Sequence, residues 1–449
     1  MAFIQASLAW SKPFSSDTKK SHAFQSLPTQ REPVRALVLS FTSQPIPPKF
    51  PNTSVALLTN NFISSIYHFS LRFPGITSFL VSLLLYFPPL WHYIGLNESS
   101  DRYGLMMQQA RDPFSIQYNT IDNVLAYRPI VPIFNHFLGL RGNWIAMPSI
   151  LGSLALCILT ATIFRRVAKG KQLFVVTLLI ACSQIVVSGT TFWSATDSLA
   201  IATVLGIIFT RNLWIESLLV FLAISMDERS IVAILLLPIL LNISQSAQTA
   251  SLRVHFSCYL RWLPGVAMAG LLRLMIDSGV MLPAPIQHYQ YNIIANSLLS
   301  ASAFHPFAVS YTIIQWLGSL RWLWIFPALL FVEFLSSMRS NLHRISNLTE
   351  ALESRWLGTG YSFLMVAFYF ILNLAAGDQW RCALYIFPVI YSAIILGFQR
   401  GISQQISLPL LLLMIITPQA CLGSAMGTLV SLQIVYPMPL VLARTLMGK

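Results

Sequence analysis

The sequence predicts an all-α fold, a polytopic integral membrane protein with about 11–13 transmembrane helices. Of its 449 residues, 55% are hydrophobic, and the mean hydropathy is +0.65. Only 10% of the residues are charged, whereas soluble chains carry about a quarter. Apolar runs recur from about residue 76 to the end. They are too long and continuous for the alternating segments of a β-barrel.

The net charge of +13 does not indicate a nucleic-acid-binding protein. No basic stripe with interleaved aromatic residues occurs in a polar segment. The basic residues gather in short loops, as the positive-inside bias of membrane proteins produces. The five cysteines stand singly within or beside apolar segments, without the spacing of a zinc site, and we expect them to be small buried hydrophobic side chains.

Residues 1–74 are mostly polar and are punctuated by proline and serine, as in PIPPKFPNTS at 45–54. The segment does not fit a signal peptide, because no charged start is followed at once by an apolar core and a cleavage site. The sequence predicts a flexible cytoplasmic tail over 1–74. It predicts a transmembrane domain over 75–449, which includes an extracytoplasmic loop at 95–143.

The first two predicted helices enclose this loop. Residues 75–94 are long enough to cross a hydrocarbon layer of ~30 Å, and residues 144–164 form the second helix. The second helix ends in RRVAKGK (165–171), whose positive charges mark the cytoplasmic side. The loop 95–143 is therefore predicted to lie outside the cytoplasm.

Alternation from that anchor places the remaining helices. Helices are expected at 172–189, at 262–280, within 312–337 and at 359–376. Between them, further helices are expected to return to the cytoplasmic side by Arg211, at 242–261 and at Arg400, and one is expected to emerge at 226–230. A final apolar pair ends near Lys449. All seven lysines then fall on the cytoplasmic side, and nine of the fifteen acidic residues fall in outer loops or at outer helix ends. This asymmetry is what the positive-inside rule requires.

The loop 95–143 concentrates charge in a chain that has little. It holds four acidic residues and four arginines but no lysine: Glu98, Asp101, Asp112, Asp122, Arg102, Arg111, Arg128 and Arg141. Three further clusters are predicted on the same side, namely Asp197, the triplet 227–229, and Asp378 with Arg381. Each alone has an ordinary explanation, such as a helix cap or a surface ion pair. Gathered on one membrane face, they predict a polar site.

Carboxylates and arginines are the groups that sugar transfer from a lipid-linked phosphate requires. A carboxylate accepts the proton of the acceptor hydroxyl or holds a divalent cation. Arginine binds phosphate oxygens bidentately, where lysine acts as a point charge. We therefore interpret 95–143 as the catalytic loop of a membrane-embedded transferase, which the later helices complete.

Four segments carry a resemblance to a known family. DRYGLMMQQARDPF (101–114) and YRPIVPIFNHFLGL (127–140) resemble the first outer loop of multi-spanning glycosyltransferases of the GT-C type. MDERSIVAILLLPILL (226–241) is similar to their acidic turn that opens an apolar helix, and GDQWRCALYIFPVIY (377–391) to their late Asp-x-x-Arg helix start. The resemblance implies a polyprenyl-phosphate-sugar donor and catalysis on the extracytoplasmic side of the membrane.

The resemblance also assigns roles to residues. Asp101 matches the acidic position of the first loop and would be the catalytic base or a ligand of a divalent cation, Mg²⁺ or Mn²⁺. The commoner acidic pair is not present, because Ser100 and Arg102 flank it. Asp112 is the alternative base. The predicted substrate- and phosphate-binding residues are Arg128, Arg229, Arg381, Glu228, Asp378 and Asp197.

The leading hypothesis is a membrane glycosyltransferase that moves a sugar from a polyprenyl-phosphate donor to an extracytoplasmic lipid, glycan or protein. Membrane lipids and the donor are its expected partners, and nucleic acid is not. The main alternative is a transporter or flippase of lipid-linked or small solutes, which Arg321 favours because it lies within an expected helix. A non-catalytic GT-C-like membrane protein is the third hypothesis, since the acidic pair at Asp101 is altered.

Overall fold

A computed structural model describes ten segments of the chain. They are residues 64–86, 101–114, 126–191, 196–245, 255–282, 304–341, 355–374, 379–425, 428–435 and 437–447. All of them belong to one compact unit that spans residues 61–449. Of the predicted tail, 1–74, residues 1–63 lie outside the described residues. Its last part, Ser64–Arg72, forms a helix.

The described fold is helical, as predicted, apart from one two-stranded hairpin. The longer helices are α3 (Pro74–Leu85), α5 (Asp101–Arg111), α7 (Ile130–Phe137), α8 (Met147–Phe164), α9 (Gly170–Ala181), α10 (Gln184–Thr191), α11 (Asp197–Gly206), α12 (Leu213–Met226), α13 (Ser230–Gln245), α14 (His255–Asp277), α16 (Pro306–Leu320), α17 (Ile325–Asn341), α19 (Arg355–Asn373), α21 (Phe387–Gln399), α22 (Ile402–Ile416) and α23 (Met438–Leu446). Short helices are η3 (Gly142–Ala146), η4 (Ile207–Phe209), η7 (Arg321–Trp324), α20 (Gln379–Cys382) and η8 (Ala383–Ile386).

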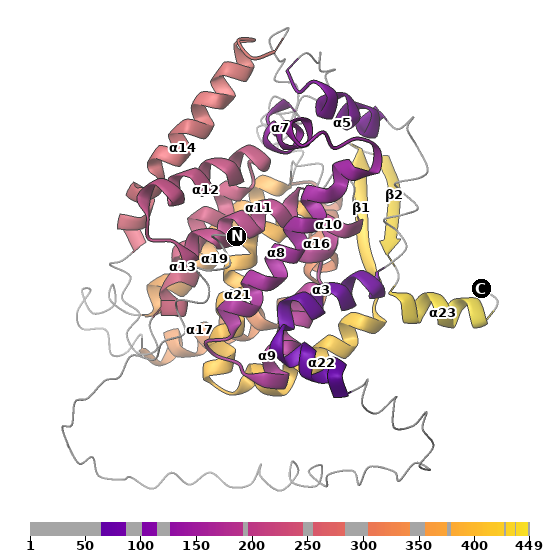
Figure 1. The fold of residues 1–449 in the computed structure, drawn as a ribbon. Coiled ribbons are helices and arrows are strands. Elements are labelled where there is room, and N and C mark those ends of the chain that lie inside the picture. The colour runs from indigo at the N-terminus through magenta and orange to yellow at the C-terminus, as the bar shows by residue number, and fades with distance from the viewer. Residues whose placement is uncertain are drawn as a thin grey trace, which may run out of the picture. The chain divides into compact units, whose positions relative to one another are not determined.

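The prediction of a final pair of apolar helices is wrong for the second helix, because a β-hairpin follows α22. After α22, strands β1 (Gln419–Ala425) and β2 (Thr428–Val435) pair in antiparallel fashion, with Gln419 opposite Val435 and an irregularity after Gly423. The strand β2 has the sequence TLVSLQIV, and its β-branched residues favour an extended backbone over a helix. Only the short α23 follows (Figure 1).

One part of the core forms where α8 packs against α3, α9, α10 and α11 (Figure 1), and the same apolar cluster continues through α13, η8, α21 and α22. Small residues allow these helices to approach closely. A Cβ atom on Gly152 of α8 would lie 2.6 Å from the Cα of Leu199 on α11. Close contacts of this kind are typical of helices that pack within a membrane.

Fewer helices are long enough to cross a membrane than the sequence predicts. Among the described residues, two helices have the length and apolar composition of a span, Trp144–Phe164 and Val309–Val332. Two bent pairs raise the number to four if each pair counts as one span: Ser64–Arg72 with Pro74–Leu85, at 117°, and Gly170–Ala181 with Gln184–Thr190, at 59°. These apolar helices fit a membrane-associated protein.

The reason for the smaller number is that several apolar runs are interrupted. The expected helix 172–189 divides after Ala181, and the chain turns at Cys182 and Ser183 before α10. The expected helix 75–94 ends as α3 at Leu85, and residues 87–100 lie outside the described residues. Six further apolar helices are 10–17 residues long: Asp197–Phe209, Leu213–Met226, Ser230–Ile243, Gly360–Asn373, Ala383–Gln399 and Ile402–Ile416.

Arg321, the charge within the expected helix 312–337, has a structural explanation. Its guanidinium donates hydrogen bonds to the carbonyl oxygens of Cys182, Met414 (2.9 Å) and Thr417 (2.8 Å), and to the hydroxyl of Tyr86 (3.2 Å). Cys182, Thr417 and Tyr86 are the C-caps of α9, α22 and α3. The positive charge therefore lies where three helices end, and there it satisfies carbonyl groups that have no partner within their own helices.

Candidate functional site

The predicted outer loop contains helices. The helix α5 packs against α7 and η3, and the Nη1 atom of Arg141 donates to the carbonyl oxygen of Ala110 at 2.6 Å. Arg128 lies just before α7, which begins at Ile130. These contacts hold the segment that carries Asp101 next to the segment that carries Arg128.

Asp197 lies at the start of α11 and is fully buried. Its Oδ2 atom accepts a hydrogen bond from Nε of Arg381 at 2.8 Å. Its Oδ1 atom accepts from Nη2 of Arg229 at 3.2 Å and from the hydroxyl of Tyr385 at 3.1 Å. Thr196, the N-cap, uses its hydroxyl to donate to the carbonyl of Met226 at 3.2 Å. Asp197 therefore binds side chains from α20, from η8 and from the turn before α13.

Asp227 lies in that turn, between α12 and α13, and is also fully buried. Its Oδ1 atom accepts from the backbone N–H of Arg229 at 3.1 Å and from Nε of the same residue at 2.7 Å. Its Oδ2 atom pairs with Nη2 of Arg229, with Nη1 of Arg128 at 3.4 Å and with Nη2 of Arg381 at 3.5 Å. Three guanidiniums thus converge on one carboxylate.

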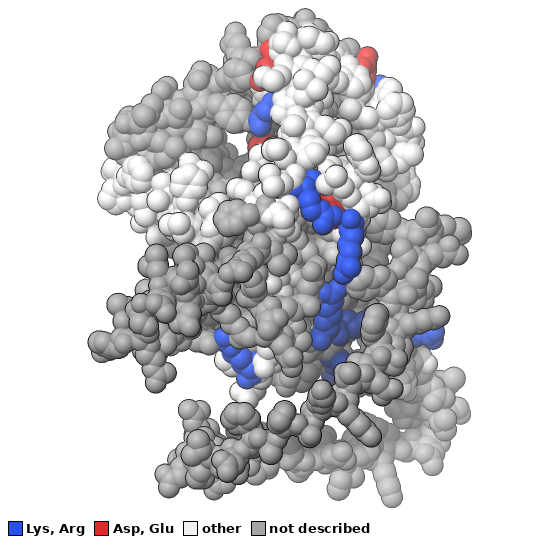
Figure 2. Space-filling view, turned by 90° about the vertical axis from the view of Figure 1, so that its left-hand side faces the viewer, with Lys and Arg blue, Asp and Glu red and all other residues white. Residues whose placement is uncertain are grey.

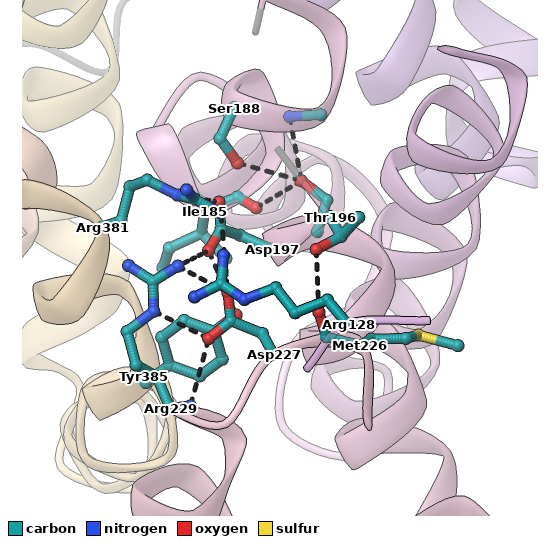
Figure 3. Close-up of polar contacts among 12 residues, drawn as sticks. Arg128, Ile185, Ser188, Thr196, Asp197, Met226, Asp227, Arg229, Arg381 and Tyr385 are labelled. Atoms are coloured by element: carbon teal, nitrogen blue, oxygen red, sulfur yellow. Dashed lines mark hydrogen bonds and ion pairs between the residues drawn. The ribbon is translucent and has the colours of Figure 1, made fainter. Parts of the chain in front are cut away.

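Arg128 makes a two-pronged contact with Glu228. Its Nε atom donates to Oε2 at 3.1 Å, and its Nη2 atom donates to Oε1 at 2.8 Å. Figure 3 shows Arg128, Arg229, Arg381 and Tyr385 arranged around Asp197 and Asp227. We call the seven residues Arg128, Asp197, Asp227, Glu228, Arg229, Arg381 and Tyr385 the arginine–carboxylate network.

The network is balanced in charge and unevenly buried. Three guanidiniums face three carboxylates, so their formal charges cancel. The arginine side chains are 7–11% exposed, whereas the side chain of Glu228 is 25% exposed. Glu228 is therefore the carboxylate of the network that solvent or a ligand reaches most easily.

The arginines control the ionisation of the carboxylates that they enclose. Burial alone would raise the pKa of Asp227, but the positive charges of Arg128, Arg229 and Arg381 outweigh it and hold that pKa well below its usual range. Glu228 behaves in the same way, because Arg128 offsets its burial and lowers its pKa. Both groups are therefore carboxylates at neutral pH.

Five predicted binding residues meet in the network: Arg128, Asp197, Glu228, Arg229 and Arg381. Asp378 and Asp122 lie outside the described residues, and so does the side chain of Asp101, although Asp101 is the first residue of α5. Asp112 is exposed beyond the end of α5, where its Oδ1 atom accepts from the backbone N–H of Phe114 at 3.1 Å. The roles given to Asp101 and Asp112 remain predictions.

Two network members had no predicted role: Asp227, which belongs to the predicted polar cluster 227–229, and Tyr385, which the sequence did not single out. Asp227 precedes Glu228 in the same acidic turn, so the motif MDERS contained the signal for it. Tyr385 follows Arg381 by four residues, a spacing that places two side chains on one helix face. Its ring also lies under Arg229, with the guanidinium carbon 5.4 Å from the ring centroid. A search for polar partners of Arg381 at helical spacing would have found Tyr385.

A second contact joins α14 to the segment of Arg128. The hydroxyl of Tyr127 donates to Oδ1 of Asp277, and the guanidinium of Arg273 lies 4.4 Å from the centroid of the Tyr127 ring. Tyr127, Ala126, Ile276 and Leu282 also form a small apolar cluster. The end of α14 therefore helps to position the backbone from which Arg128 reaches Glu228.

Among the described residues, no group of three or more histidine, cysteine, aspartate or glutamate side chains is placed to hold a metal ion. The carboxylates of the network are already paired with arginines. Asp101 as a ligand of Mg²⁺ or Mn²⁺ therefore stays a prediction from the sequence.

Comparisons with known proteins add no identification. No family model, no curated protein and no solved structure matches this chain. The resemblance to GT-C glycosyltransferases rests on the four sequence segments alone.

Proposed function

We propose that this protein is a membrane glycosyltransferase of the GT-C type, with a polyprenyl-phosphate sugar as donor and an extracytoplasmic acceptor. The observation that carries the proposal is the convergence of Arg128, Arg229 and Arg381 from three distant parts of the chain. Fixed guanidiniums stabilise the negative charge that develops on a leaving phosphate. Arginine also offers the planar pair of donors that a phosphate group binds.

In the proposed reaction, a hydroxyl oxygen of the acceptor attacks the anomeric carbon of the donor sugar. The new glycosidic bond forms as the bond between that carbon and the phosphate oxygen breaks. The polyprenyl phosphate leaves with the bonding electrons, and the carboxylate of Asp101 accepts the hydroxyl proton. Asp112 is the alternative base. The packing of α5 against α7 supports this assignment, because it keeps Asp101 and Arg128 on adjacent segments.

The proposal places about 11–13 apolar segments in the membrane, with the shorter helices crossing or entering it in part. Large exposed apolar residues on α14 support contact with lipid: Leu260, Leu263, Leu271 and Leu274 are 59–73% exposed. On the face drawn in Figure 2, acidic atoms lie toward the upper end and basic atoms extend to the lower end. This distribution supports an extracytoplasmic site at the end that carries α5 and α7.

The charge balance of the network favours the alternative of a non-catalytic membrane protein. The formal charges of the network cancel, and Asp197 and Asp227 are fully enclosed. An enclosed, neutral set of ion pairs also suits a non-catalytic membrane protein in which the network only joins helices. The argument for a transporter is weaker, because Arg321 binds helix ends.

Transfer in membrane vesicles tests the proposal. Vesicles that contain the full chain would be given a panel of radiolabelled polyprenyl-phosphate sugars, and the labelled product would be separated from the donor. We expect transfer with at least one donor, and a loss of about 100-fold or more in Asp101→Asn. Asp17→Asn, the same substitution in the N-terminal segment and distant in sequence from the loop 95–143, is the control and should keep the wild-type rate.

The outcomes separate the hypotheses. Wild-type rates in both Asp101→Asn and Asp112→Asn would reject the proposed base. An absence of transfer with every donor, in protein that retains its thermal unfolding transition, would favour the non-catalytic alternative.

A further inference from the structure

Glu228 is held less firmly than the other carboxylates of the network. Asp227 pairs with three arginines, and Asp197 pairs with two arginines and Tyr385. Glu228 is paired with Arg128 and is 25% exposed, whereas the other two carboxylates are fully buried. Of the three, Glu228 needs the least rearrangement to leave its arginine.

The contact that Glu228 makes is one that a phosphate group can copy. Two oxygens of one carboxylate bind Nε and Nη2 of Arg128 at 3.1 and 2.8 Å. Two oxygens of a phosphate bind the same edge of a guanidinium in the same planar fashion. The position of the Glu228 carboxylate therefore marks where an anionic ligand of Arg128 would bind.

Charge balance supports the exchange. With Glu228 in place, three positive and three negative charges cancel. If Glu228 turns toward solvent, the remaining five charged residues carry one net positive charge, because Asp197 and Asp227 stay enclosed. An incoming phosphate supplies negative charge in place of Glu228, and Arg128 keeps Asp227 at 3.4 Å as a second counter-ion during the exchange.

We propose that Glu228 is an internal competitor that occupies Arg128 in the unliganded protein and yields this position to the phosphate group of a polyprenyl phosphate. The inference rests on the proposed function for the lipid that carries the phosphate. The exchange itself is a binding property and requires no transfer reaction. In this proposal Glu228 controls the affinity for the ligand, and Arg128 binds the phosphate group.

Calorimetric titration of the full chain in nanodiscs tests the exchange. The ligands would be farnesyl phosphate, inorganic phosphate and neutral farnesol. In Glu228→Gln the side chain keeps its shape but loses its charge, and we expect farnesyl phosphate to bind about fivefold more tightly than to wild type. Arg128→Gln should lose this binding.

Glu216→Gln is the matched control. Glu216 pairs with Arg261 at 2.6 Å and is not a member of the network, so its loss removes one ion pair elsewhere. Farnesyl phosphate should bind this variant as it binds wild type. For each variant, the unfolding temperature would also be measured with and without farnesyl phosphate. The difference between the two values reports binding even if Glu228→Gln is less stable than wild type.

Each outcome decides a point. Equal or weaker binding of farnesyl phosphate to Glu228→Gln would overturn the inference, and so would equal binding of farnesol. An equal gain for inorganic phosphate would support the exchange but reject a lipid as the source of the phosphate. Tighter binding without transfer from any donor would support the exchange while the proposed function fails.

Discussion

Nε of Arg381 donates to Oδ2 of Asp197 at 2.8 Å, although 184 residues separate them along the chain. Both side chains are buried, with exposed fractions of 7% and 0%. The pair joins α20 to the start of α11, and Asp227 extends the same network to the turn between α12 and α13. A contact of this length in sequence fixes the relative position of three helical segments at one point.

Replacing Asp227 by asparagine should therefore destabilise the protein strongly. The change removes the carboxylate that three arginines share and leaves three largely buried guanidiniums facing only two carboxylates, Asp197 and Glu228. We expect a loss of about 3–5 kcal/mol in the free energy of unfolding. Glu228→Gln, whose ion pair is partly exposed, should cost about 1 kcal/mol. Denaturation in detergent, followed by tryptophan fluorescence, measures both values. Similar losses in the two variants would contradict the inference that Asp227 contributes more to stability than Glu228.

The stability should also depend on pH through Asp227. Its pKa is lower in the folded protein than in the unfolded chain, where the pKa of an aspartate is about 3.9. The stabilisation is therefore fully present above the unfolded pKa and is lost as the pH falls toward the folded pKa. We expect a constant unfolding temperature from about pH 5 to 8 and a steep fall below about pH 4. Asp227→Asn should be less stable at neutral pH and should show a shallower fall, and a parallel curve would count against this explanation.

The sequence carried enough information to predict most of the network but not its connections. Arg128, Asp197, Glu228, Arg229 and Arg381 stood out because charge is rare in this chain and these residues lie at the ends of apolar runs. Which guanidinium meets which carboxylate depends on how helices pack, and spacing in the sequence does not determine that. The distinction between an enclosed Asp227 and a partly open Glu228, neighbours in the chain, appears only in three dimensions.

The breaks within apolar runs were harder to predict. Hydropathy is continuous across Ala181 and Gln184, so the sequence indicated one helix where α9 and α10 meet at 59°. The turn there allows Arg321 to reach the carbonyl of Cys182, a contact that involves residues 139 positions apart. A hydropathy pattern describes the burial of a segment, and a distant polar partner can still decide where its helix ends.

Arg321 should be essential for this arrangement of helix ends. In Arg321→Met, the unbranched side chain replaces the aliphatic part of arginine but donates no hydrogen bonds to the carbonyls of Cys182, Met414 and Thr417. The carbonyl of Met414 keeps a hydrogen bond from the hydroxyl of Tyr86 at 3.3 Å. Each buried hydrogen bond lost at the other helix ends costs about 1–3 kcal/mol, so we expect a total loss of at least about 2 kcal/mol. Thermal unfolding measures the effect.

Arg165→Met is the control for Arg321→Met. Arg165 is exposed at the end of α8, so its replacement should change the free energy of unfolding by less than about 0.5 kcal/mol. If the two variants unfold alike, Arg321 does not hold the ends of α3, α9 and α22, and its charge would again favour a transport role.

Two glycines on α14 provide a test of its packing against α12. A Cβ atom on Gly265 would lie 2.3 Å from the carbonyl oxygen of Ser217, a backbone atom that cannot move without shifting α12. For Gly270, no heavy atom lies within 4 Å of the same position. Gly265→Ala should therefore destabilise the protein by about 1–3 kcal/mol. Gly270→Ala should leave its stability unchanged or raise it by up to about 1 kcal/mol, because alanine favours a helix.

The comparison is well matched because both changes add one methyl group to the same helix. Unfolding in detergent gives the two free energies. Equal stability of the two variants would mean that α14 does not pack closely at Gly265. The support that the end of α14 gives to Arg128 would then depend on the hydrogen bond from Tyr127 to Asp277 and on the apolar cluster around Tyr127, because α12 would no longer fix the middle of α14.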